Sequence, residues 1–302
     1  MGVDDLVAPM FVREGIDAAV PIESMPGVVQ HTQASLRDEV GQLVALGVPA
    51  VILFGVPEHR DAVGSGASDP QGIVQLALVD LRDRFGDDIV IMADLCLDEY
   101  TDHGHCGIVT ADGRVDNDST LERYAEVAVA QARAGAHVVA PSGMMDGQVA
   151  AIRAALDGDG YEEVAILAYG AKYSSGLYGP FRDAVDVTIT GGGNRNQYQQ
   201  DSRNRRESLL EISLDVAEGA DMVMVKPAVT YLDVVADARR AFDVPIAAYH
   251  VSGEYSMIQA AAERGWIDGP RVALEQLTAV KRAGADVILT YFAHQAAEQW
   301  LA

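Results

Sequence analysis

Short apolar segments that alternate with longer helical stretches most strongly constrain the fold of this 302-residue chain. The apolar segments are rich in Val, Ile, Leu and Ala, which is typical of parallel strands buried on both faces. They cover residues 6–12, 50–56, 89–95, 137–141, 164–169, 222–225, 245–249 and 287–291. Helical periodicity is clearest at residues 36–46, 76–85, 121–134, 208–217, 232–242 and 272–283. Eight strands alternating with helices indicate an α/β protein.

Two architectures fit this alternation, a closed (β/α)₈ (TIM) barrel and an open doubly wound sheet. An open sheet that binds a dinucleotide would carry Gly-x-Gly-x-x-Gly after its first strand, but residues 11–15 read Phe-Val-Arg-Glu-Gly. Barrels also reach this chain length as one unit. We therefore expect a single barrel domain over residues 1–302, with its active site at the C-terminal ends of the strands.

The charge and the apolar runs of the sequence exclude several classes of partner. The formal net charge is −23, which disfavours nucleic acid and anionic membranes as partners. No apolar run reaches the roughly 18–20 residues that cross a bilayer, and the N-terminus lacks the pattern of a signal peptide. We expect a cytoplasmic protein that binds neither nucleic acid nor membrane.

Lysine is rare in this sequence, and two of its three lysines lie close to the ends of expected strands. Lys172 follows the fifth strand and Lys226 the sixth, whereas Lys281 lies in an expected helix. Burial beside another ammonium group lowers the pKa of a lysine, and a neutral amine can form a Schiff base with a ketone. The alternative is a pair of structural lysines that form salt bridges with carboxylates.

A candidate metal site follows the third strand. Cys96, Asp98 and Cys106 offer two thiolates, which favour zinc, and a carboxylate, which also accommodates magnesium. His105 is a further candidate ligand or a donor to a ligand, and His103 is read as an ordinary loop residue. Two unrelated buried thiols are the alternative to a metal site.

The longest irregular stretch, at about residues 173–206, is a candidate lid and contains three consecutive glycines at 191–193. Arg182 and Arg195 lie in it and could hold a substrate carboxylate, or they could be ordinary surface residues. Glu207 follows at the start of a helix, where helix capping explains this carboxylate as well as a functional role does.

Several motifs together resemble the porphobilinogen synthase (5-aminolevulinate dehydratase) family, over about residues 8–292. The motifs are Asp94-Leu-Cys-Leu-Asp-Glu-Tyr100 with His103-Gly-His-Cys-Gly107, Ala140-Pro-Ser-Gly-Met-Met-Asp-Gly147, Tyr169-Gly-Ala-Lys-Tyr-Ser174 with Tyr178-Gly-Pro-Phe-Arg-Asp183, Met224-Val-Lys-Pro227 and Tyr249-His-Val-Ser-Gly-Glu-Tyr255. The resemblance implies a lyase that condenses two 5-aminolevulinate molecules to porphobilinogen, with loss of two waters, in haem and porphyrin biosynthesis.

The resemblance also implies a role for each site residue. Lys226 would form a Schiff base with the propionate-side substrate, and Lys172 with the acetate-side substrate. Ser252 and Tyr291 would hold the first carboxylate. The second would be held by Arg182, Arg195 and Gln199. In the propionate-side site, Asp94 and Ser142 would contact the amino group, and Tyr178, Phe181 and Tyr249 would form walls. Glu207 matches a position that binds an allosteric magnesium in some relatives.

Some positions depart from the family's usual pattern. Asp98 stands where zinc-type relatives have a third cysteine, while Cys96 and Cys106 stand where magnesium-type relatives have Ala and Asp. We therefore expect zinc, magnesium or both, and no organic cofactor. Gly143 follows Ser142 where Asp is usual, and Asn194 and Asn196 flank Arg195 where Asp and Lys are usual.

Most relatives begin with an arm that embraces a neighbouring subunit, and this arm is largely absent from the sequence. The expected assembly is a homo-oligomer, either the octamer of the family or a smaller one.

Two other functions were weighed against the synthase. A Schiff-base barrel of the class I aldolase type needs one essential lysine, which leaves the second lysine and the two carboxylate clamps without a purpose. A non-catalytic metal-binding or scaffold barrel would show no amine reactivity.

Overall fold

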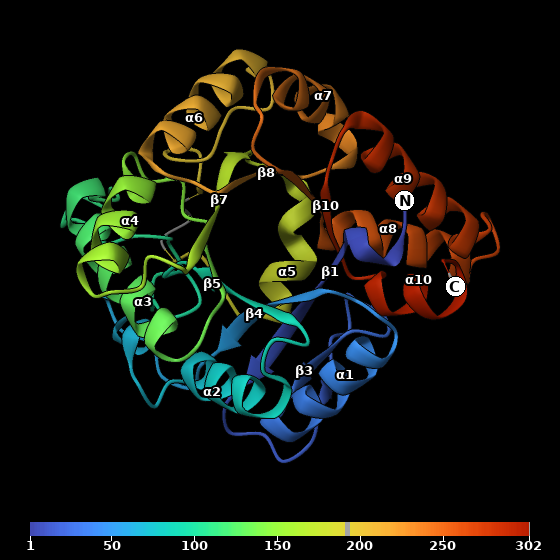
Figure 1. Ribbon diagram of the computed structural model, residues 1–302, viewed down its shortest axis with the longest axis horizontal. Coiled ribbons are helices and arrows are strands. Elements are labelled where there is room, and N and C mark those ends of the chain that lie inside the picture. Colours follow the sequence, from blue (N-terminus) through green and yellow to red (C-terminus); the bar gives the residue numbers. More distant parts are fainter. Residues whose placement is uncertain (191–193, 302) are drawn as a thin grey trace.

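Parallel strands close into a barrel in the computed structural model, which describes residues 1–190 and 194–301 (Figure 1). The strands of the barrel are, in order, β1 (Leu6–Arg13), β4 (Ala50–Val56), β5 (Val90–Leu95), β6 (Val138–Pro141), β7 (Ala165–Lys172), β8 (Met222–Lys226), β9 (Ile246–His250) and β10 (Val287–Thr290). The barrel closes where β1 pairs in parallel with β10, with Leu6 opposite Ile288. The predicted eight-stranded barrel is confirmed.

Helices surround the barrel as an outer ring (Figure 1). They are α1 (Gln33–Ala45), α2 (Ile73–Phe85), α3 (Asn117–Arg133), α4 (Gln148–Gly158), α6 (Arg205–Glu218), α7 (Leu232–Ala241), α8 (Ser252–Glu263), α9 (Gly269–Ala283) and α10 (Ala293–Gln299). Polar caps explain why several helices begin before their apolar periodicity does. The side chain of Asp116, for example, accepts a hydrogen bond from Ser119 N–H at the start of α3, four residues before the predicted start.

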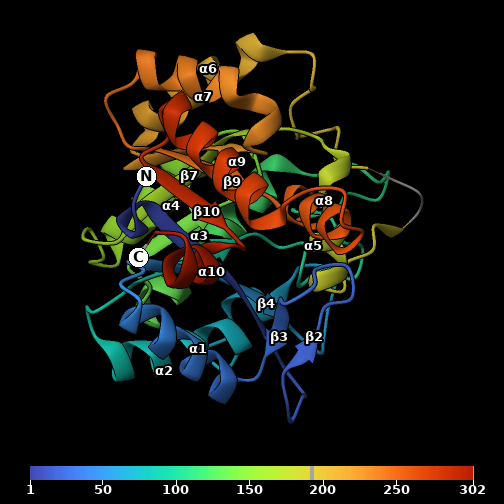
Figure 2. The ribbon, with the colours of Figure 1, turned by 90° about the vertical axis from the view of Figure 1, so that its right-hand side faces the viewer.

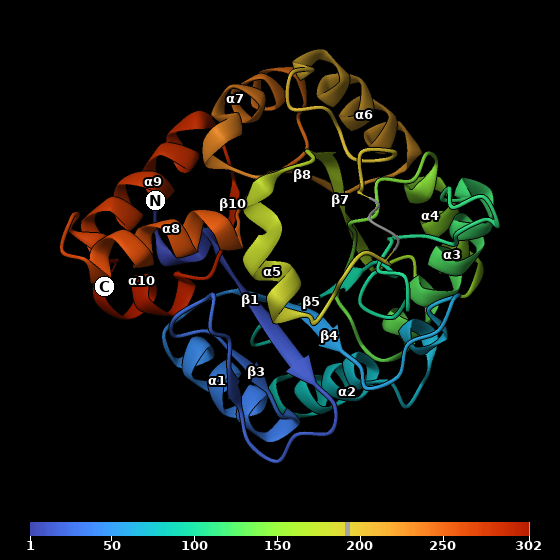
Figure 3. The ribbon, with the colours of Figure 1, turned by 180° about the vertical axis from the view of Figure 1, so that it is seen from behind.

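One end of the barrel carries additional elements that bound the site. The short helices η3 (Gly176–Tyr178) and α5 (Gly179–Ala184) follow β7, and α5 lies across the mouth of the barrel (Figure 3). Figure 2 shows α5 and α8 at this end and both chain termini toward the other. Two short strands that were not predicted, β2 (Val20–Pro21) and β3 (Val29–His31), also lie here, with β3 paired to the end of β1.

The predicted lid of residues 173–206 thus contains η3 and α5 and ends at the start of α6. Its three glycines at 191–193 lie outside the described residues. In the described part of the chain, no helix is both long and apolar enough to cross a membrane.

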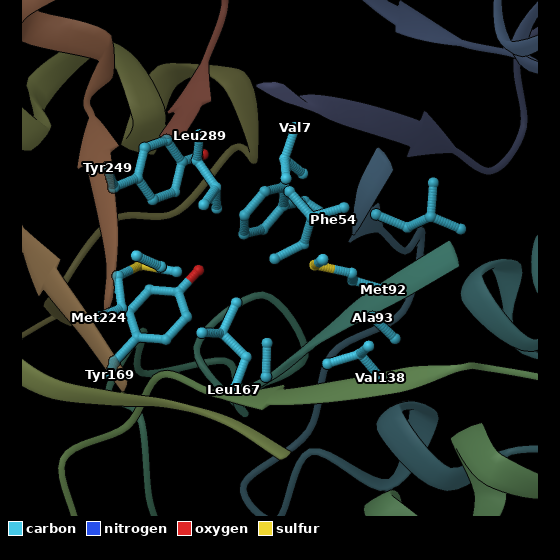
Figure 4. Packing of buried hydrophobic residues seen from close by; sticks show 14 of the residues in the cluster. Val7, Phe54, Met92, Ala93, Val138, Leu167, Tyr169, Met224, Tyr249 and Leu289 are labelled. Carbon is cyan, nitrogen blue, oxygen red and sulfur yellow. The ribbon is translucent and has the colours of Figure 1, made fainter. Parts of the chain in front are cut away.

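Side chains fill the barrel interior, as in other barrels of this type (Figure 4). Val7, Leu167 and Leu289 are almost fully buried there. The large rings of Tyr169 and Tyr249 point into the same interior and are buried as well (Figure 4). This packing fixes the strands relative to one another and so fixes the positions of the residues at their C-terminal ends.

Candidate active site

The two predicted lysines are neighbours at the C-terminal ends of adjacent strands. Lys172 is the last residue of β7 and Lys226 the last of β8, and the strand register places them opposite one another. Each side chain is buried, with 5% of its residue surface exposed. Both lysines line the same small cavity at the barrel mouth. The structure therefore brings two amines together in an enclosed space.

Aromatic rings surround the amine of Lys226. Its Nζ atom lies 4.4 Å from the ring centre of Tyr249, 5.1 Å from those of Tyr169 and Phe181, and 5.4 Å from that of Tyr178. Burial, and next the positive charge of Lys172, lower the pKa of Lys226 to about 7. The rings attract a cation, which offsets part of that shift. Lys226 therefore loses its proton more easily than an ordinary lysine, and its neutral amine is nucleophilic.

Lys172 has more polar surroundings. Its Nζ donates a hydrogen bond of 2.5 Å to the carbonyl oxygen of Ser142. Burial acts to lower the pKa of Lys172, but the electrostatic effects of Cys106, Cys96 and Asp98 outweigh it, so the pKa is raised overall. The two lysines are thus chemically unequal although they are neighbours.

Asp94 and Ser142 lie beside the lysines. The Ser142 hydroxyl donates to Asp94 Oδ2 at 3.0 Å, and Asp94 Oδ1 has no hydrogen-bond partner among the described residues. Burial raises the pKa of Asp94 to about 6, against the attraction of Lys172 and Lys226. Asp94 lines the cavity with the two lysines, and its Oδ1 is available to accept a hydrogen bond there.

Two cavities meet at the lid. The inner cavity holds about 10 Å³, which is room for about one water. Its lining consists of Phe54, Asp94, Asp98, Glu99, Ser142, Lys172, Tyr178, Phe181, Arg182, Arg195 and Lys226. An outer cavity of about 560 Å³ shares Tyr178, Arg182 and Arg195 with it and adds Gln199. A substrate larger than water therefore needs the lid side chains to move before it can reach the lysines.

The predicted metal ligands come together. The ligand atoms of Cys96, Asp98 and Cys106 all lie within 4.8 Å of one another, and the three residues are buried. Both cysteines are free thiols, and Cys106 Sγ lies 3.7 Å from Asp98 Oδ1. Two sulfurs and one carboxylate fit a zinc ion that keeps a fourth position open for water or substrate. His105 is not part of this group; its Nδ1 faces the hydroxyl of Tyr198 at 3.2 Å.

The acidity of these groups follows from their partners. Although burial alone would raise it, the Arg195 guanidinium holds the pKa of Asp98 well below its usual range. Burial would also raise the pKa of Cys106, yet its hydrogen bond with Cys96 and the charge of Arg195 lower it overall. Burial, and then the same hydrogen bond, raise the pKa of Cys96. Cys106 is therefore the more readily ionised thiol.

Arg195 connects the predicted lid to the segment 96–106 that carries the candidate metal ligands, which we call the metal loop. Its Nη2 atom donates to Asp98 Oδ2 at 2.7 Å and to the carbonyl oxygen of Gly104 at 2.9 Å. Nε of Arg195 and Nε2 of Gln199 are buried and have no partner among the described residues. The predicted carboxylate clamp thus retains donors that are available, although one edge of Arg195 is bound to Asp98.

Ser252 and Tyr291 lie on the Lys226 side of the site. The Ser252 hydroxyl accepts a hydrogen bond from Phe181 N–H at 3.0 Å and donates to the carbonyl oxygen of Leu177 at 3.3 Å, so it holds α5 in place. The hydroxyls of Tyr291 and Tyr249 are 3.0 Å apart. In this structure Ser252 is engaged with the lid rather than facing open space.

Glu207 lies away from the lysines, at the start of α6. Its backbone N–H is capped by the Asn204 side chain, and its carboxylate accepts from Asn204 Nδ2 at 2.8 Å. It also lines a cavity of about 670 Å³ with the carboxylates of Asp146, Asp201 and Glu211. The Glu207 carboxylate is thus part of a helix cap and also borders a cavity lined by carboxylates.

Sequence reasoning missed Glu99 and Tyr169. Glu99 lines the inner cavity with a buried Oε1 that lacks a partner among the described residues, and burial raises its pKa well above the usual range. The Tyr169 hydroxyl is buried and likewise has no hydrogen-bond partner among the residues that the structure describes. The available signal was position: Glu99 adjoins Asp98, and Tyr169 lies in the strand that ends at Lys172.

A closed barrel with two amines in a cavity at its mouth, next to a cysteine–carboxylate cluster, defines the class as a (β/α)₈ barrel suited to Schiff-base chemistry. The model of the family described as delta-aminolevulinic acid dehydratase matches residues 1–299, and the chain belongs to this family. The predicted family membership is thereby confirmed.

Curated relatives agree with this membership. The delta-aminolevulinic acid dehydratase of Streptomyces coelicolor is 60% identical over 295 residues, which are 97% of this chain and 89% of that protein. That of Mycobacterium tuberculosis is 59% identical over 298 residues, 98% of this chain and 90% of that protein. A crystal structure of the enzyme from Toxoplasma gondii, in complex with the reaction product porphobilinogen, superposes with a TM-score of 0.97 at 42% identity. It covers 99% of this chain and 85% of that one.

Proposed function

We propose that this chain is a porphobilinogen synthase, a hydro-lyase that condenses two 5-aminolevulinate molecules to porphobilinogen with loss of two waters. Lys226 and Lys172 each bind one substrate as a Schiff base. The observation that carries this proposal is the pair of buried amines at the ends of β7 and β8 in a member of this family.

Lys226 supplies the first nucleophile. Its neutral amine attacks the ketone carbon of one 5-aminolevulinate to give a carbinolamine. The carbinolamine takes up a proton and loses water to become an iminium ion. The rings around Nζ stabilise that cation. Asp94, with a pKa of about 6 and an oxygen without a partner in the described chain, is suited to exchange protons with the substrate.

Two identical substrates must be held in different orientations, and the two halves of the site differ accordingly. On the Lys226 side, Tyr178, Phe181 and Tyr249 form the walls, and Ser252 with Tyr291 bind a carboxylate. On the Lys172 side, Arg182, Arg195 and Gln199 bind the second carboxylate by charge-assisted hydrogen bonds. Asp94 and Ser142 contact the amino group of the substrate on the Lys226 side.

Cys96, Asp98 and Cys106 would hold zinc, because their two sulfurs favour it over magnesium. A divalent cation there supplies Lewis-acid polarisation of a bound oxygen. Glu207 and the carboxylates around it would hold magnesium, a hard cation that prefers oxygen ligands. The assembly is proposed to be a homo-oligomer, and light scattering would distinguish the octamer of the family from a smaller one.

Replacement of Lys226 by Ala tests this function. We expect porphobilinogen formation to fall by several orders of magnitude, on the order of 10⁴-fold or more, because the nucleophile is lost. The matched control is Lys281→Ala, since Lys281 is partly exposed and pairs with Asp5. Near-wild-type turnover in Lys226→Ala would refute the mechanism.

A further inference from the structure

The hydroxyl of Tyr124 lies beside both cysteines of the proposed metal site. Tyr124 belongs to α3 and is fully buried. Its Oη atom donates a hydrogen bond of 2.7 Å to the carbonyl oxygen of Cys106 and lies 3.9 Å from Cys96 Sγ. A buried hydroxyl at this place contacts the main chain of one thiol ligand and the sulfur of the other.

Gly143 provides the space in which that hydroxyl sits. A Cβ atom at position 143 would lie 1.6 Å from Tyr124 Oη and 2.6 Å from its Cζ, so any side chain there would force the tyrosine ring to move. The backbone of Gly143 is not in the left-handed region, so its conformation alone does not call for glycine. The close approach of the tyrosine explains the glycine.

A second hydroxyl holds the other side of Cys106. Tyr198, in the lid segment, accepts a hydrogen bond from Cys106 N–H at 3.3 Å. The main chain of Cys106 is therefore bound between two tyrosine hydroxyls, one from α3 and one from the lid. Fixing the main chain on both sides limits the directions in which the Cys106 sulfur can point.

We infer that Tyr124 is a positioning residue of this metal site, and that Gly143 is the position that admits it. The hydroxyl orients the two thiolates toward one point and so favours a thiophilic divalent cation of the zinc class. This inference rests on the proposed Cys96, Asp98 and Cys106 site. The affinity for thiophilic cations should therefore depend on Tyr124 more than the affinity for magnesium does, because magnesium prefers oxygen ligands.

Cobalt(II) titration of the metal-free enzyme, followed by zinc competition, tests this role through the thiolate-to-cobalt charge-transfer absorption. In Tyr124→Phe we expect the affinities for cobalt and zinc to fall by about 10–100-fold, as for other partners of metal ligands. Magnesium binding should stay unchanged. The matched control is Tyr161→Phe, since the Tyr161 hydroxyl makes no hydrogen bond to the residues described by the structure.

Gly143→Ala is the second variant, because its added methyl group must displace the hydroxyl while Tyr124 is kept. We expect the same selective loss of cobalt and zinc affinity. The matched control is Gly158→Ala, where an added Cβ meets nothing within 4 Å; this variant should bind cobalt and zinc as the wild type does. If the wild type shows the charge-transfer band and either Tyr124→Phe or Gly143→Ala binds cobalt and zinc as tightly as the wild type, the role of Tyr124 is overturned. The proposed metal site is not affected by that result. Absence of the band in the wild type would remove the metal site and this inference together.

Discussion

The unequal acidity of the two lysines is the main chemical asymmetry of the site. Lys226 lies among aromatic rings with a pKa of about 7, and Lys172 lies next to thiols and a carboxylate that raise its pKa. Because only the neutral amine attacks a ketone, Lys226 is ready to react at a pH where Lys172 is still protonated. Under the proposed function, we therefore expect the first substrate to bind at Lys226.

The pH dependence of Lys226 reactivity tests that order. Below a pH of about 7 the amine is protonated and inert, so the rate of Schiff-base trapping at Lys226 should rise with pH and level off above that value. Lys172→Met removes a neighbouring positive charge and should therefore move the midpoint upward, while Lys172→Arg keeps the charge and should leave it in place. The midpoint is measured by cyanoborohydride trapping across pH. An identical midpoint in Lys172→Met and the wild type would contradict the assigned cause.

Sequence reasoning at this scale succeeded where position alone brings residues together. Lys172, Lys226, Asp94 and Ser142 all lie at or next to the C-terminal ends of parallel strands, and such ends converge at one mouth of a barrel. The pairing of Arg195 with Asp98 spans 97 residues, and the contact of Tyr124 with Cys96 spans 28. Neither contact follows from spacing in the sequence, since each depends on how the lid and α3 pack on the barrel.

At the scale of elements, the lid is tied to the metal loop by a buried ion pair. The side chains of Arg195 and Asp98 are 8% and 4% exposed. Removing one partner leaves an uncompensated buried charge, so Arg195→Met should lower the free energy of unfolding by about 3–5 kcal/mol. Arg203→Met is the control, because its pair with Asp201 is exposed.

Denaturant unfolding of the metal-free protein measures this effect. The double variant Arg195→Met with Asp98→Asn should recover part of the loss, because the carboxylate that Arg195 neutralises is then absent. Equal stability of Arg195→Met and Arg203→Met would show that the lid and the metal loop are not held by this pair.

Strands were predicted more completely than helices for a physical reason. Both faces of a barrel strand are buried, so composition alone marks it, and β4 was placed at its observed bounds. β7 extends to Lys172, beyond the predicted end, and the sequence pattern missed this because Gly170 and Ala171 have low strand propensity. The prediction left out α4, α5, α8 and α10, and the last of these is an alanine-rich segment with a weak apolar pattern.

At the scale of the whole molecule, the net charge of −23 acts against compactness through self-repulsion. Raising sodium chloride from about 0.01 to 0.15 M shortens the screening length from roughly 30 to 8 Å. The melting temperature should therefore rise, by roughly 2–4 °C for each kcal/mol of repulsion removed. Calorimetry at several salt concentrations, with an equal osmolarity of uncharged glycerol as the control, measures this. A melting temperature that falls with salt would show that attractive ion pairs dominate.

Reduction with borohydride in the presence of 5-aminolevulinate, followed by peptide mapping, tests the central claim about the two amines most directly. We predict stable substrate adducts on Lys226 first and on Lys172 at higher substrate concentration, with Lys281 unlabelled as an internal control. Adducts on neither barrel lysine, or labelling of Lys281 alone, would contradict the assignment of the two amines.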